Sequence, residues 1–146
     1  MTTSQHLALR AAIVQILQAA PALASGRIKP GRQRVPMVAG VPEEVRVWLH
    51  EADATRADTA GRRTHWQTQI AVHCMARTAG GVESADRVDA LAQDVVARLA
   101  GNPTLGGLAL GSELRRVTWE GEALDTDVDD TVLVFAISHR TPATTL

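Results

Sequence analysis

Apolar residues recur at helical spacing in two segments of the chain. The first stripe precedes Pro21, whose ring blocks continuation of a helix, and it comprises Leu9, Ile13, Ile16, Leu17 and Ala20. The second follows Ser84, a residue type suited to cap a helix start, and it comprises Val88, Leu91, Val95 and Leu99. Gly101 and Pro103 then stop this segment. The pattern predicts two amphipathic helices, one ending near Ala20 and one over residues 84–100.

Four further segments read as β-strands: 45–50, 64–77, 113–120 and 131–139. In 64–77 apolar and polar residues alternate, which indicates a sheet covered on one face. In 131–139 both faces are apolar, so we expect both to be covered, by a helix or by a neighbouring subunit. The order helix, strand, strand, helix, strand, strand predicts one α+β domain over residues 1–146, with two helices packed on a mainly antiparallel mixed sheet.

Three segments lack such patterns. Residues 51–63 have no apolar period and predict a long mobile loop in the first hairpin, a functional candidate because loops beyond ~12 residues are uncommon. Ser25-Gly26 predicts a turn, with a short strand at Ile28. The last residues, 141–146, are expected to be loose.

Composition narrows the classes of function. The 146 residues are 45% hydrophobic and 21% charged, with a formal net charge of −1, so no general affinity for nucleic acid or acidic membranes is expected. The apolar runs are shorter than the ~20 residues that span a bilayer. The opening residues lack the basic and apolar regions of a secretory signal, and Cys74 is the only cysteine. We therefore expect folding in a cytoplasm.

No residue pattern in the sequence clearly predicts a catalytic or metal-binding site. The alternate aspartates from Asp125 resemble the start of a calcium loop, but Asp130 stands where that loop needs glycine and Ala136 where it needs glutamate. His65 and His73 share a strand face about 25 Å apart, at ~3.3 Å per residue, so they cannot bind one metal. Cys74 alternates with core residues. We therefore expect no catalytic, cofactor-binding or metal-binding residues, and no enzyme.

Charged residues cluster in three segments, and two interpretations remain open. They are either ordinary solvated loops or surfaces that bind another subunit or protein partner, with basic and acidic segments meeting between copies. The candidate interface residues are Arg27, Lys29, Arg32, Arg34, Arg56, Arg62, Arg63, Asp125, Asp127, Asp129 and Asp130.

The order of these features resembles a known family. After the first helix come a basic segment broken by Pro and Gly and the run Val41-Pro42-Glu43-Glu44-Val45-Arg46-Val47. After the second helix come Asn102-Pro103-Thr104-Leu105-Gly106-Gly107-Leu108, a strand ending Thr118-Trp119-Glu120 and a closing strand. The chain thereby resembles, over nearly its whole length, the tail terminator or minor tail protein U-like family of long-tailed bacteriophages and their prophages. Its most specific part is the Thr-Leu-Gly-Gly-Leu run.

The resemblance implies a structural role in the virion tail. Members of that family form a ring, typically a hexamer, on the end of the tail tube; the ring ends tube polymerisation and presents a surface for the head. The implied partners are other copies of the chain, the tail tube protein and a head-completion protein, assembled in the bacterial host cytoplasm. The alternatives are another head-to-tail joining protein, such as a neck or stopper subunit, and a small metal-binding domain.

Overall fold

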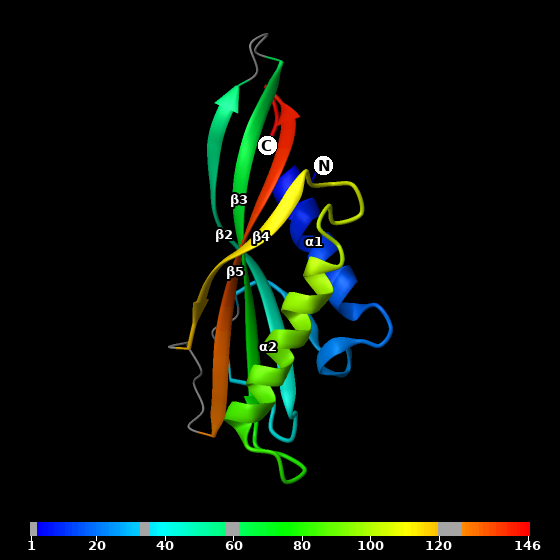
Figure 1. Cartoon of the computed structure of the whole chain (residues 1–146), viewed down its shortest axis with the longest axis vertical. Coiled ribbons are helices and arrows are strands. Elements are labelled where there is room, and N and C mark those ends of the chain that lie inside the picture. Colours follow the sequence, from blue (N-terminus) through cyan, green and yellow to red (C-terminus); the bar gives the residue numbers. More distant parts are fainter. Residues whose placement is uncertain (1–2, 33–35, 58–61, 120–126) are drawn as a thin grey trace.

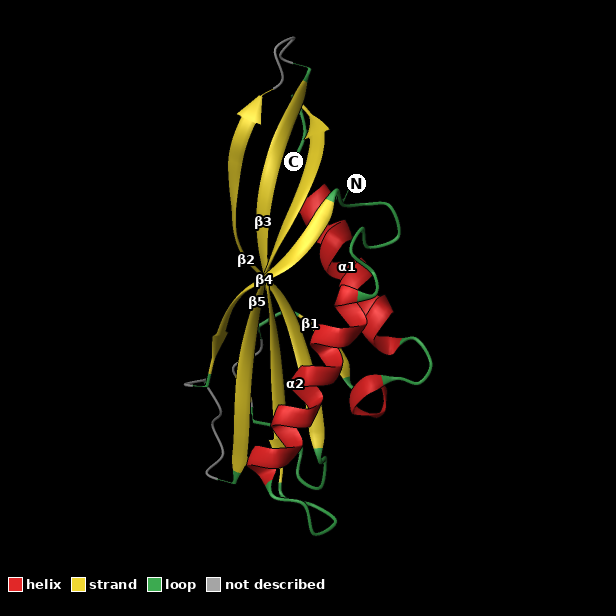
Figure 2. Ribbon diagram, in the orientation of Figure 1, coloured by secondary structure: helices red, strands yellow, loops and turns green. Residues whose placement is uncertain are grey.

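The computed structural model describes residues 3–32, 36–57, 62–119 and 127–146, with the side chains of Arg56 and Ala57 left undescribed. Both helices lie on one face of a long, twisted sheet (Figures 1 and 2). Among the described residues, no helix combines the length and apolar character needed to cross a membrane. In chain order the elements are α1 (Gln5–Gln18), a 3-10 turn (Leu23–Gly26), β1 (Ile28–Pro30), β2 (Glu43–Ala57), β3 (Arg63–Arg77), α2 (Ser84–Ala100), β4 (Gly111–Thr118) and β5 (Val128–Pro142).

The sheet has five strands in the order β1-β2-β3-β5-β4. The β1–β2 pair is parallel and the other pairs are antiparallel. The predicted α+β class, with two helices on a mainly antiparallel mixed sheet, is therefore confirmed. The short strand predicted at Ile28 forms β1 at one edge of this sheet.

The predicted loop over residues 51–63 is largely wrong, because β2 continues to Ala57 and β3 begins at Arg63. In register, Glu51 pairs with Gln69 and Ala57 with Thr64, while residues 58–61 lie outside the described part of the chain. The exposed side chains of residues 51–55 explain the missing apolar alternation. The period of two appears in sequence only where one strand face is buried.

The core lies between the two helices and one face of the sheet. Both predicted helical stripes point into it, and β3 and β5 contribute their alternating apolar residues. The start of α2 differs from prediction: the cap residue is Glu83, while Ser84 is the first helical residue and donates its backbone N–H to the Thr78 hydroxyl over 3.0 Å. A neighbouring side chain thus supplies the cap that Ser84 was expected to supply.

The opposite sheet face was expected to be polar and uncovered along β3, yet Ala71, His73 and Met75 are buried there. A parallel β1–β2 pair requires a crossover. The crossover passes over this face: the Arg32 guanidinium lies 5.4 Å from the centre of the Trp48 ring, and the Trp48 and His73 rings meet edge to face.

Both apolar faces of β5 are consequently covered by this chain itself. Leu133, Phe135 and Ile137 lie under the helices, and Val134 and Ala136 are buried on the opposite face. This removes the need for a neighbouring subunit over β5.

Candidate assembly surfaces

The sequence-predicted acidic residues do not form one exposed loop. Asp129 and Asp130 belong to β5. Asp130 is buried, with its carboxylate 2.7 Å from Nε2 of His73, and Asp129 accepts a hydrogen bond from the Ser84 hydroxyl. Asp127 pairs with Arg77 at 2.7 Å and remains exposed, while Asp125 lies outside the described residues. Asp130 is therefore buried within this chain, where its carboxylate faces His73 and not the solvent.

The basic residues divide into two groups. Arg27, Lys29 and Arg32 hold β1 and the crossover to this chain: Arg27 donates to the Glu43 carbonyl over 2.9 Å, Lys29 pairs with Glu44 at 2.7 Å, and Arg32 covers Trp48. Arg62 and Arg63 are exposed at the start of β3. Arg34 and the side chain of Arg56 lie outside the described part of the structure.

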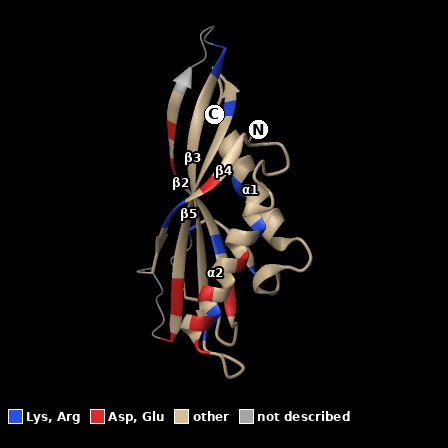
Figure 3. Cartoon of the chain, in the orientation of Figure 1, with Lys and Arg blue, Asp and Glu red and all other residues tan. Residues whose placement is uncertain are grey.

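The strand ends that carry Arg62 and Arg63 project past the start of α1 (Figures 1 and 2). We call this projection the arm, and it consists of residues 51–57, 62–67 and 138–142. Arg140 of β5 is also exposed on it. Figure 3 shows Lys and Arg at the far end of the arm, and Asp and Glu both on the β2 part of the arm and around the starts of α2 and β5 at the opposite end of the molecule. The tip of the arm is therefore basic, although the exposed Glu51 and Asp53 of β2 also belong to the arm.

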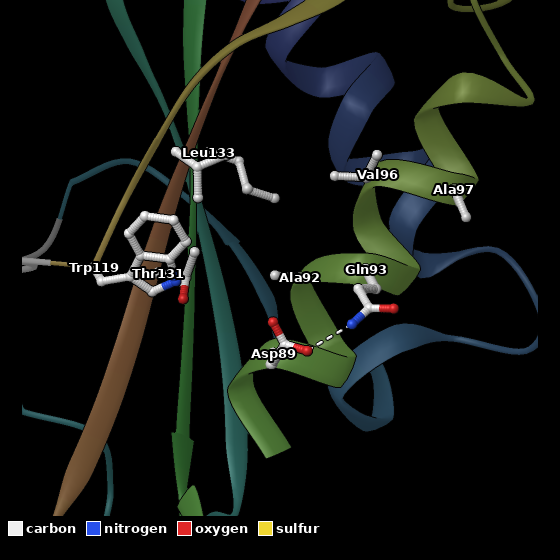
Figure 4. Close-up of a pocket in the computed structure, with 9 residues that line it drawn as sticks. Asp89, Ala92, Gln93, Val96, Ala97, Trp119, Thr131 and Leu133 are labelled. Carbon is white, nitrogen blue, oxygen red and sulfur yellow. Dashed lines mark hydrogen bonds between the residues drawn. The ribbon is translucent and has the colours of Figure 1, made fainter. Parts of the chain in front are cut away.

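An apolar groove of about 420 Å³ lies between α2 and the strands β4 and β5. Figure 4 shows the Trp119 ring on the strand side of this groove and Ala92 on the α2 side, with Asp89 at one end. Trp119, directly after β4, is 70% exposed. The groove residues are Asp89, Ala92, Gln93, Val96, Ala97, Val117, Trp119, Thr131 and Leu133.

Sequence reasoning missed this groove because it placed Trp119 within a strand. The available signal was a tryptophan directly before a Gly- and acid-rich segment, at the end of the outer strand β4. A solvent-exposed tryptophan beside an apolar groove is typical of a protein interaction site.

The Thr-Leu-Gly-Gly-Leu run forms the turn between α2 and β4. Leu105 is buried in the core, whereas Leu108 and Leu110 are exposed. Gly106 and Gly107 have φ of +72° and +92°, a conformation that side-chain-bearing residues rarely adopt. The run therefore anchors one leucine and turns the next ones outward beside the outer strand.

The described residues hold no group of three or more His, Cys, Asp or Glu side chains placed to bind a metal ion. Burial, and then the nearby Glu43 carboxylate, raise the pKa of Cys74 to about 12. The thiol is therefore protonated at neutral pH and unsuited to nucleophilic chemistry.

A polar cluster is buried where the arm meets α1. The Thr68 hydroxyl lies 2.9 Å from Nδ1 of His6 and 2.7 Å from Nε2 of His139. Trp66 donates its indole N–H to the Thr141 hydroxyl, which donates to the Thr145 carbonyl. These contacts, with the hydrogen bond from the Gln5 N–H to the Leu146 carbonyl over 2.9 Å, show that the end of the chain is held rather than loose as predicted.

We expect this cluster to make stability depend on pH. Burial, and secondarily the nearby His6, lower the pKa of His139 from 6.5 to about 4, so the unfolded chain binds a proton more readily. The stabilising contribution is complete above pH 6.5 and is lost as the pH falls toward 4. Urea unfolding should show a loss of stability between pH 7 and pH 4 that is about 1–3 kcal/mol smaller in the His139→Gln variant. An equal decrease in both proteins would contradict this assignment.

No protein-family model matches the chain. No curated protein matches it either. Its fold matches a chain from the virion of a native gene transfer agent particle, with a TM-score of 0.58 and 17% sequence identity, over 91% of this chain and 95% of that chain. The two chains therefore share one fold along almost their entire lengths.

Proposed function

We propose that this protein is a structural component of a phage-like virion, one that caps the tail tube as a ring, ends tube polymerisation and offers the surface to which the head joins. The main support for this proposal is the fold that the protein shares with a chain of a gene transfer agent virion. The shared fold extends over nearly all of both chains. The Thr-Leu-Gly-Gly-Leu run and the order of elements favour the tail terminator role within that setting. The ring is a homo-oligomer, hexameric by the same resemblance, and its other partners are the tail tube and head-completion proteins.

Two surface features support assembly. The groove with Trp119 offers an apolar contact, and the arm offers an exposed basic one. These are different patches on one chain, and a closed ring requires contact between different patches of successive subunits. Of the interface residues expected from sequence, Arg62 and Arg63 have the exposure that such a contact needs.

In this proposal the protein is not an enzyme and lies in the virion tail, assembled in the host cytoplasm, and the likeness to a virion chain supports that location. The groove is lined mainly by apolar side chains, and the only buried thiol is held in its protonated form. Neither offers an activated nucleophile for catalysis.

The proposal is tested with a tail tube protein from the same genome. Purified protein added during tube polymerisation should give shorter tubes that carry a ring at one end in negative-stain electron microscopy. The Leu110→Ser variant, which changes an exposed residue outside the groove, should still cap the tubes. Tubes of unchanged length without rings would exclude a terminator.

A neck or stopper subunit is the second candidate, because the virion likeness fits any head-to-tail joining protein equally well. In that case the protein should bind isolated heads and leave tube growth unaffected. The same microscopy on heads and tubes separates the two roles.

A further inference from the structure

The groove has the chemistry to bind an arginine side chain. Its apolar walls suit the aliphatic stem of arginine, and the exposed Trp119 ring can stack against a guanidinium. Asp89 adds a carboxylate at the end of the groove, where its Oδ2 accepts a hydrogen bond from Gln93 and its other oxygen can accept from a guanidinium. A tryptophan face and a carboxylate together favour arginine over an apolar side chain or a lysine.

The arm presents arginines of this kind on one face. Thr64 and Trp66 share the helix side of the sheet, so Arg63 and His65 point to the other side. Arg140 pairs directly with His65, which places Arg63 and Arg140 at neighbouring diagonal positions of that same face. Both are exposed. The arm therefore offers two adjacent guanidinium groups on a rigid three-stranded support.

Within one chain the arm and the groove cannot meet. The groove lies beside Trp119 and the middle of α2, whereas the arm lies at the other end of the sheet (Figures 1 and 4). The groove carries the carboxylate of Asp89, and the tip of the arm carries Arg63 and Arg140, with Glu51 and Asp53 farther from the tip along β2. The occupant whose charged groups suit the groove is thus the tip of the arm of a second copy.

We propose that the arm of each subunit inserts Arg63 or Arg140 between Trp119 and α2 of the next subunit, an inference that rests on the proposed ring and names its contact. The contact is heterologous, because each subunit gives its arm on one side and its groove on the other. Repetition of such a contact produces a ring when the rotation closes.

Disulfide trapping between single-cysteine additions tests the contact even if association is weak. His65→Cys protein, which keeps both Arg63 and Arg140 on the same face of the arm, is mixed with Gln93→Cys protein under mild oxidation. The mixed cross-chain disulfide is followed by non-reducing electrophoresis. Gln15→Cys, an exposed glutamine on α1 outside the groove, replaces Gln93→Cys as the matched control. The native Cys74 is buried in every variant and does not compete.

We expect the 65–93 disulfide to form at least roughly tenfold faster than the 65–15 disulfide, because the contact raises the effective thiol concentration. Adding Trp119→Ala to the Gln93→Cys protein should return the rate to that of the control. Equal rates for the two pairs, or a faster 93–93 disulfide, would overturn the arm-in-groove contact. Tail capping without the 65–93 disulfide would refute this contact alone, whereas the disulfide without capping would refute the terminator function alone.

Discussion

Glu44→Ala is expected to lower the free energy of unfolding by about 3–5 kcal/mol, the usual effect of removing one partner of a buried ion pair. Glu44 is 1% exposed and sits on the sheet face opposite the helices. One carboxylate oxygen lies 2.7 Å from Nζ of Lys29, and the other lies 2.7 Å from the Arg46 guanidinium. Lys29 can turn to solvent when the carboxylate is removed, but the buried Arg46 cannot, and its charge would lose this compensation.

The matched control for this prediction is Glu113→Ala. Glu113 pairs with Arg115 at 2.5 Å, but the two side chains are 62% and 49% exposed. Solvent screens such a pair, so its removal should change stability by only about 0–1 kcal/mol. Chemical unfolding followed by tryptophan fluorescence measures both variants. Similar losses for the two would mean that the buried network contributes no more than a surface pair.

Phe135→Ala is expected to destabilise the protein by about 3–5 kcal/mol through loss of apolar burial and creation of a cavity. Phe135 is the only phenylalanine, is 3% exposed and lies at the middle of β5 under the helices. On its two sides it pairs in register with Ile70 of β3 and Leu114 of β4. Few of its neighbours can move into the vacated space, because the strands on both sides are held in register.

Leu114→Ala provides the comparison within the same strand pair. Leu114 shares the sheet face of Phe135 but lies on the outer strand and is 39% exposed. Its truncation should cost about 1 kcal/mol or less, since the lost atoms are already partly in water. A loss for Leu114→Ala equal to that for Phe135→Ala would show that the core is not centred under the helices.

Both predictions also concern assembly, because ring formation needs a rigid sheet between the arm and the groove. The arm and the groove belong to opposite ends of the sheet. Phe135 pairs on one side with β3, which extends into the arm, and on the other side with β4, which leads to Trp119 at the groove. A subunit that presents both patches in a fixed relation needs a rigid sheet between them. Variants that weaken this sheet should therefore reduce ring formation in proportion to their loss of stability, whereas Trp119→Ala should reduce it without that loss.

Local periodicity was sufficient for the two helices, the core faces of β3 and β5 and the α+β class. The stripes at Leu9 to Leu17 and Val88 to Leu99 record a single burial direction for each helix, and burial direction is what a period of 3.6 encodes. The short strand at Ile28 was also visible, because turn residues flank it. These features depend on neighbours within one turn or one strand.

The arm, the crossover and the groove depended on contacts between distant segments. Residues 51–57 form a strand only because β3 supplies hydrogen-bond partners, and the exposed side chains of residues 51–55 leave no apolar alternation in the sequence. Asp130 looked like part of an acidic loop until His73, far away in the chain, was placed beside it. Trp119 became an exposed groove residue only when α2 packed against β5. Pattern reveals which side of an element is buried, whereas pairing across the sheet determines where an element ends and which polar groups meet.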